Sequence, residues 1–227
     1  MDQKLEKWEK WLKSIRYEVM DLVRSKHIFW KLGDIVKNNP KIQKSNSFYE
    51  FAGDTYIAYS VIGVRRQIKP HRDSISFVGL LQEIVEMPCV LSRERFVALY
   101  GKDSQLEANH DFDQFACADA EHIEPNWVKQ DLEKLKGLGR EVKNFADKRI
   151  AHYDKQPVEN IPSFGELDAC IDFLAELTKK YWLLFKGTSI EMLVMPIVDY
   201  WDEIFRQPWI PPDAPNKIID PDPLGMY

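Results

Sequence analysis

Residues 2–38 form a long run of helical periodicity, and this run constrains the fold more than any other stretch of the chain. Apolar side chains recur there at spacings of three or four residues, which places them on one face of an α-helix. They are Leu5, Trp8, Leu12, Ile15, Val19 and Leu22. Charged side chains occupy the other face. The run therefore predicts a long amphipathic helix, and Pro40 should end it because proline disfavours the α conformation at the residue before it.

Helix-start signals recur along the rest of the chain. Three pairs have the spacing of a capping box: Ser47 with Glu50, Ser163 with Glu166, and Thr188 with Glu191. They predict helices over about 47–66, 163–187 and 188–205. Further helices should begin at a capping serine or at a first-turn proline, namely Ser74 or Ser76, Ser92, and Pro125. Gly137 and Gly139 predict a break in the last of these helices.

No stretch alternates apolar and polar residues between hairpin turns, so the sequence predicts an all-α protein. We expect a bundle of about six to eight helices, formed as a single domain by residues 1–207. The last 20 residues contain six prolines, which exclude a continuous helix. Residues 208–227 are therefore expected to form an extended Pro-rich tail that lies along the body or a partner.

Charge and composition narrow the function. The formal net charge is -5, so the chain as a whole repels nucleic acid and would bind it only through a local basic patch. The three cysteines are odd in number and lack CxxC spacing, which favours a reducing, cytoplasmic location. The charged N-terminus and the absence of an apolar run of about 18 residues predict neither a signal peptide nor a membrane span.

Two regions of the sequence are basic. Residues 65–72 contain four Lys or Arg side chains and no acid, and residues 129–155 contain eight against five acids. Such clusters are suited to phosphate groups. Cations at a helix C-terminus also complement the helix dipole, which is a purely structural role for Arg65 and Arg66.

An acidic region separates the two basic ones. Residues 103–124 contain seven Asp or Glu side chains and no Lys or Arg, which predicts a solvated loop or short helix. Potential metal ligands occur in it: His110, Asp111, Asp113, Cys117 and His122. Their spacing is that of neither a zinc site nor a calcium loop. We therefore expect no metal there.

The stretch KNFADKRIAHYDK, residues 143–155, carries the chemistry. His152 lies three or four positions from Lys148, Arg149 and Lys155, which is one helical face. An imidazole titrates near neutral pH, and a guanidinium holds a phosphate through two hydrogen bonds. The stretch therefore predicts a site that handles phosphates.

The segment DKRIAHYDK, residues 147–155, resembles the conserved-motif region of the HEPN superfamily, helical-bundle proteins of prokaryotic defence and toxin systems. RRQIKPHRDSISFVGLLQEI and KYWLLFKG are similar to the abortive-infection, AbiU-like branch. The resemblance covers most of residues 45–205. It implies a HEPN-like bundle that forms a homodimer, acts on RNA in antiviral defence or a toxin–antitoxin system, and pairs with an antitoxin or another protein.

The resemblance also implies a mechanism. Many HEPN proteins are endoribonucleases that use no metal or other cofactor and that bring two Arg-x(4–6)-His motifs together at the dimer interface. The Arg contacts the scissile phosphate, and the His supports proton transfer while the RNA 2'-hydroxyl attacks. His152 corresponds to that His, and Asp147 to the polar residue that commonly follows the Arg.

The Arg itself is replaced, because Ala146 occupies its position. Arg149 or Lys148 could supply the cation from one turn before His152, or Arg65 or Arg66 could supply it from another helix. The candidate catalytic residues are His152, Arg149 and Asp147. The candidate RNA-binding residues are Lys148, Lys155, Arg65 and Arg66. The alternative is a non-catalytic HEPN-like module for dimerisation and partner binding.

Overall fold

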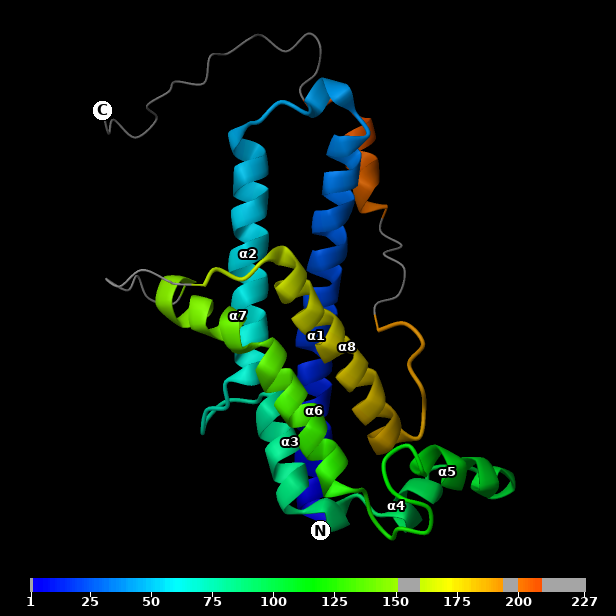
Figure 1. Ribbon diagram of the computed structural model, residues 1–227. Coiled ribbons are helices and arrows are strands. Elements are labelled where there is room, and N and C mark those ends of the chain that lie inside the picture. The colour runs from blue at the N-terminus through cyan, green and yellow to red at the C-terminus, as the bar shows by residue number, and fades with distance from the viewer. Residues whose placement is uncertain (1, 151–159, 194–199, 210–227) are drawn as a thin grey trace. The chain divides into compact units, whose positions relative to one another are not determined.

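The computed structural model of the chain describes residues 2–150, 160–193 and 200–209. All regular elements in these ranges are helices, apart from an isolated bridge between Ser92 and His122. The all-α class is therefore confirmed (Figure 1). The chain divides into two compact units, Met1–Val194 and Met195–Tyr227. The single domain over residues 1–207 stays a prediction, as does the extended tail, of which only Pro208 and Trp209 are described.

The first unit holds the α-helices of the described chain. They are α1 (Asp2–Lys37), α2 (Ser47–Ile68), α3 (Phe77–Glu86), α4 (Arg93–Val97), α5 (Gln105–Phe112), α6 (Pro125–Leu138), α7 (Arg140–Phe145) and α8 (Phe164–Lys186). Short 3₁₀ turns lie at Pro40–Ile42, Pro88–Val90 and Lys102–Ser104. A π-helix, Ala146–Ile150, continues α7. In the second unit, Trp201–Arg206 forms a 3₁₀ helix.

The predicted stripe of α1 is buried in its first 22 residues. Trp8, Leu12, Ile15, Val19 and Leu22 are all less than 2% exposed, because α1 packs against α2, α3 and α8. The Trp8 indole donates a hydrogen bond of 2.7 Å to Glu83 on α3, so even its polar edge is used in packing.

Most predicted helix starts are confirmed. Ser163 and Glu166 form a complete capping box, Ser76 and Ser92 cap their helices, and Pro125 occupies the first turn of α6. Gly187 ends α8 with a φ of 63°, a left-handed conformation that glycine adopts without steric cost.

Two predicted capping boxes are wrong, although the helix predicted over 47–66 is present as α2. Asn46, not Ser47, caps α2, because its side-chain oxygen accepts hydrogen bonds from the backbone N–H groups of Phe48 and Tyr49. The pair Thr188 and Glu191 starts no helix over 188–193. The Glu191 carbonyl instead accepts a 2.7 Å hydrogen bond from Lys179 on α8. The rest of the expected 188–205 helix is described only from residue 200 and is a 3₁₀ helix over Trp201–Arg206.

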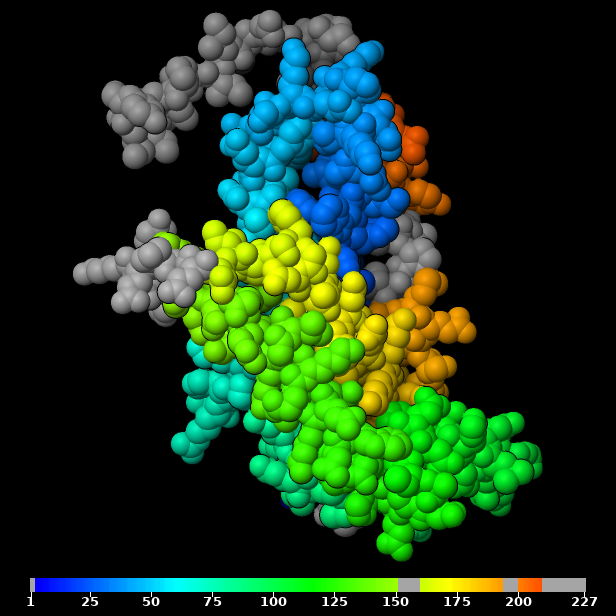
Figure 2. All heavy atoms as spheres, in the orientation of Figure 1, coloured from blue at the N-terminus to red at the C-terminus, as the bar shows by residue number. Residues whose placement is uncertain are grey.

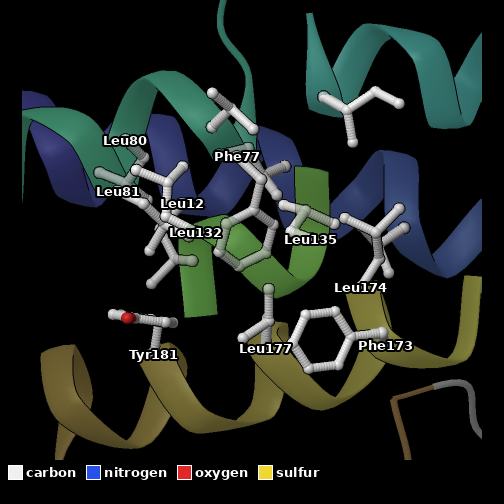
Figure 3. Close-up of a cluster of buried hydrophobic side chains, with 14 of the residues drawn as sticks. Leu12, Phe77, Leu80, Leu81, Leu132, Leu135, Phe173, Leu174, Leu177 and Tyr181 are labelled. Carbon is white, nitrogen blue, oxygen red and sulfur yellow. The ribbon is translucent and has the colours of Figure 1, made fainter. Parts of the chain in front are cut away.

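The core lies where α1, α3, α6 and α8 meet (Figure 3). Phe77, the first residue of α3, is fully buried, and its ring meets that of Tyr181 edge-on at 6.0 Å. Leucines from all four helices surround this pair. The Tyr181 hydroxyl donates to Asp131 at 2.9 Å, so the buried polar atom has the partner that it requires.

Arg93 holds the predicted acidic region, residues 103–124, through several hydrogen bonds. These residues are among those drawn in green in Figure 2. The Arg93 guanidinium donates to Asp113 at 2.7 Å and to the carbonyl oxygens of Asn109, Cys117 and Ala120 at 2.8 to 3.2 Å. The expected loop or short helix is thus the short helix α5 with the turns that follow it. These turns are held by one cation from α4.

The core makes a first prediction. Replacing the buried Phe77 with Ala should lower the free energy of unfolding by about 3–5 kcal/mol, because it removes a large side chain and leaves a cavity. The matched control is Phe51→Ala on α2, where the ring is 66% exposed and the change should stay within about 0.5 kcal/mol. Urea titration of both variants measures the difference, and equal losses would contradict the assigned core.

Candidate functional site

A close contact between two helices builds the candidate site. A Cβ atom on Gly139 would lie 2.5 Å from Cδ1 of Ile68, so the end of α6 lies directly against the end of α2, and a larger residue at 139 would require the Ile68 side chain to move. The predicted break is confirmed at this point, where α6 ends at Leu138 and α7 begins at Arg140. After the break, α7 and the π-helix pack against α2, and α7 crosses α2 at an angle (Figure 1).

The π-helix carries the residues before His152. A π-helix has a wider turn than an α-helix, and such turns are frequent at functional sites. Lys148 and Arg149 are half-buried in it. Ala146, its first residue, is fully buried in the core. An Arg at this position would have to bury its charge, so the replacement of the HEPN Arg by Ala fits its surroundings.

Asp147 joins the π-helix to the basic end of α2. Its carboxylate accepts a 2.5 Å hydrogen bond from Nε of Arg65 and bonds of 3.1 Å from Nζ of Lys69. Lys143 adds a third cation at 3.9 Å, one turn earlier. We call Asp147, Arg65 and Lys69 the Asp147 cluster.

The cluster keeps Asp147 ionised. Partial burial raises the pKa of its carboxyl, but the hydrogen bonds and charges of Arg65 and Lys69 outweigh that effect, and the pKa lies below its ordinary value. An ionised carboxylate only accepts hydrogen bonds. Asp147 therefore holds cations in place and does not donate a proton near neutral pH.

The structure brings some of the predicted site residues together. Arg65 on α2 contacts Asp147 on the π-helix. It is one of the two residues that could replace the missing Arg from another helix, but its position relative to His152 stays a prediction. Arg66 is exposed and lines a different feature, a pocket between α1 and α2 that Ile150 of the π-helix also lines. His152 and Lys155 lie outside the described residues, so their placement stays a prediction.

Several residues of this region were not singled out in the sequence. Lys143 precedes Asp147 by four residues, a spacing that could have indicated the pair. Glu18, Asp21 and Tyr59 also line the pocket beside Arg66. No spacing rule links them to the motif, because α1 and α2 come together only through tertiary packing.

The potential metal ligands of the acidic region have other partners. Asp113 pairs with Arg93, and Asp111 accepts a 2.6 Å hydrogen bond from Tyr100. Across residues 2–150, 160–193 and 200–209, no group of three His, Cys, Asp or Glu side chains is placed to hold a metal ion.

No protein-family model, curated protein or solved structure matches the chain. The kinship to HEPN proteins therefore remains a hypothesis drawn from the residues quoted above. Among the helices described, none has both the length and the apolar composition needed to cross a membrane.

The Asp147 cluster generates a pH-dependent prediction. Asp147→Asn should lower the free energy of unfolding at pH 7 by about 1–2 kcal/mol, the range for a charged hydrogen bond that is partly exposed to water. Because the folded-state pKa is lowered, this stabilisation is complete above the ordinary Asp pKa of about 3.9 and is lost as pH falls through the folded value. Unfolding titrations from pH 7 to pH 2.5 should show the two proteins converging.

A matched variant tests whether the cluster is special. Asp34 pairs with Lys31 at 3.8 Å, and both side chains are more than half exposed. Asp34→Asn should change the free energy of unfolding by less than about 0.5 kcal/mol at any pH. Equal effects of the two Asp→Asn changes would contradict the role given to Asp147.

Proposed function

We propose that this chain is a HEPN-like RNA-targeting protein of a prokaryotic defence or toxin–antitoxin system, which cleaves RNA without a metal ion. One observation carries the proposal. The basic end of α2 packs against the π-helix that leads to His152. Arg66 therefore lies on an element next to that of Lys148 and Arg149, and the Asp147 cluster joins the two elements. A chain with a net charge of -5 needs such a local concentration of cations to bind RNA.

Each group has a distinct task in the proposed reaction. His152 takes the proton from the RNA 2'-hydroxyl and returns a proton to the leaving oxygen, because imidazole titrates near neutral pH. Arg149, with Lys148 or Arg66, holds the phosphate. Asp147 is a positioning residue, since it stays ionised and fixes the side chain of Arg65.

The cytoplasm and a homodimer complete the proposal. In a two-fold assembly, two copies of the region around His152 would form one composite site, and an antitoxin or other protein partner would restrain it. The Pro-rich residues 208–227 are the segment that we assign to partner contact.

A second function has its own support. Ala146 is fully buried where the HEPN motif carries Arg, and the charge of Arg65 is paired with Asp147. Both observations favour the alternative, a non-catalytic HEPN-like module that dimerises and binds a protein partner.

One comparison separates the two functions. The purified chain, incubated with labelled RNA in EDTA, should cleave it, and His152→Ala should reduce the rate by at least about 100-fold, the usual contribution of a general acid–base. His27→Ala is the matched control, because His27 is exposed on α1 and should leave the rate unchanged.

Three results have different meanings. Cleavage that survives His152→Ala contradicts the role of His152. Cleavage that requires a divalent metal contradicts the proposed mechanism. A chain that neither binds nor cleaves RNA, yet forms a homodimer, supports the module.

The phosphate contact of Arg66 can be tested through salt. RNA binding should weaken as salt rises, because each phosphate contact releases counterions. Arg66→Ala should reduce the slope of log K against log salt by about 0.7, the value for one contact with a single strand. Lys102→Ala changes an exposed cation beside the acidic region and should leave the slope unchanged. Filter binding at several salt concentrations measures both, and equal slopes for Arg66→Ala and the unmodified chain would exclude this contact.

A further inference from the structure

A pocket of about 370 Å³ lies between α1 and α2. Its volume falls within the range of small-ligand pockets, about 300–1,000 Å³. Polar and aromatic side chains line it: Glu18 and Asp21 from α1, and Tyr59 and Arg66 from α2. Leu22, Ile62 and Ile150 supply apolar walls. The pocket therefore combines an aromatic ring, two carboxylates and one guanidinium.

A buried side chain holds one of these carboxylates. Gln67 is 1% exposed, and its amide oxygen accepts a 3.1 Å hydrogen bond from the backbone N–H of Phe77. This bond fixes the orientation of the amide, whose NH₂ group then donates to Oε2 of Glu18 at 2.7 Å. Oε1 of Glu18 accepts no hydrogen bond from the described part of the chain. Glu18 is thus positioned by the core and retains free acceptor capacity.

The charges of the pocket act on Tyr59, whose side chain is half exposed. Burial raises the pKa of its hydroxyl, Asp21 and Glu18 raise it further, and Arg66 and Arg24 oppose them. Glu18, Asp21 and Arg66 line the same pocket as Tyr59. Tyr59 keeps its proton at neutral pH and presents an aromatic face in a charged setting.

The chemistry of the nucleobases selects one ligand for such a set. An ionised carboxylate only accepts hydrogen bonds, so it fits a base edge with two adjacent N–H donors. Guanine has that edge in its N1–H and N2–H groups, whereas each other base places an acceptor beside its donor. Flipped RNA bases also stack on aromatic side chains, and a guanidinium binds phosphate.

We propose that the pocket binds a guanine nucleotide of the RNA target. The Glu18 carboxylate accepts from the guanine edge, Tyr59 stacks on the base and Arg66 binds its phosphate. Asp21 adds a second acceptor beside the base. The inference rests on the proposed RNA function, to which it adds base specificity.

Titration calorimetry of the full-length chain with GMP, AMP, CMP and UMP tests the proposal. GMP should bind at least about tenfold more tightly than the other three, because a bidentate contact to a base edge discriminates against the other bases. Glu18→Gln should remove this preference and leave the weak binding of AMP unchanged. The matched control is Glu176→Gln, an exposed change on α8 that should keep the preference. Thermal melting of each variant establishes that it is folded.

Two further variants separate the contacts. Arg66→Ala should weaken the binding of GMP but not that of guanosine, since only GMP carries the phosphate. Tyr59→Leu should weaken the binding of both ligands. Tyr59→Phe should bind them as the unmodified chain does, because stacking requires the ring and not the hydroxyl. These variants keep the test decisive if Glu18→Gln does not fold.

Several outcomes would overturn the proposal. Equal binding of the four nucleotides, or binding of none, excludes a guanine pocket. Spermidine binding that depends on Glu18, without GMP binding, would assign the carboxylates to a polyamine. A chain that prefers GMP but neither binds nor cleaves RNA would contradict the proposed RNA function and not the pocket. Conversely, equal cleavage of RNAs with and without guanine counts against the pocket alone.

Discussion

The contact between Ile68 and Gly139 sets the geometry on which the candidate site depends. At this contact α6 ends and α7 begins, and the π-helix that follows packs against α2. A side chain at residue 139 would require Ile68 to shift, because its Cβ would lie 2.5 Å from Cδ1 of Ile68. Two basic regions that are about 70 positions apart in the sequence meet at this contact.

The cations at the basic end of α2 fall into two sets. Arg65 and Lys69 neutralise Asp147, which stabilises the junction and removes much of their charge from phosphate binding. Arg66, the next residue, lines the pocket of Glu18 and Tyr59 instead. Adjacent positions on a helix point about 100° apart, so a single basic cluster serves both a structural and a proposed binding role.

Local sequence patterns predicted the helices well where packing and capping agree. The stripe of α1, the capping box of Ser163 and the break at Gly139 are present as expected. The predicted cap at Ser47 was wrong because Asn46, one position earlier, was also available as a cap. The Thr188 pair failed because a cap does not form a helix unless the following residues gain more from helical packing than from another conformation.

The sequence by itself determined the all-α class, most helix boundaries and the basic motif with Ala146 in place of Arg, because spacing, caps and residue types are local properties. Only the tertiary structure decided that Ala146 is buried, that Asp147 pairs with Arg65 and Lys69, and that Glu18 lines a pocket with Arg66. Those relations depend on which helix faces pack together. That packing is set by burial over the whole chain, which no single stretch specifies.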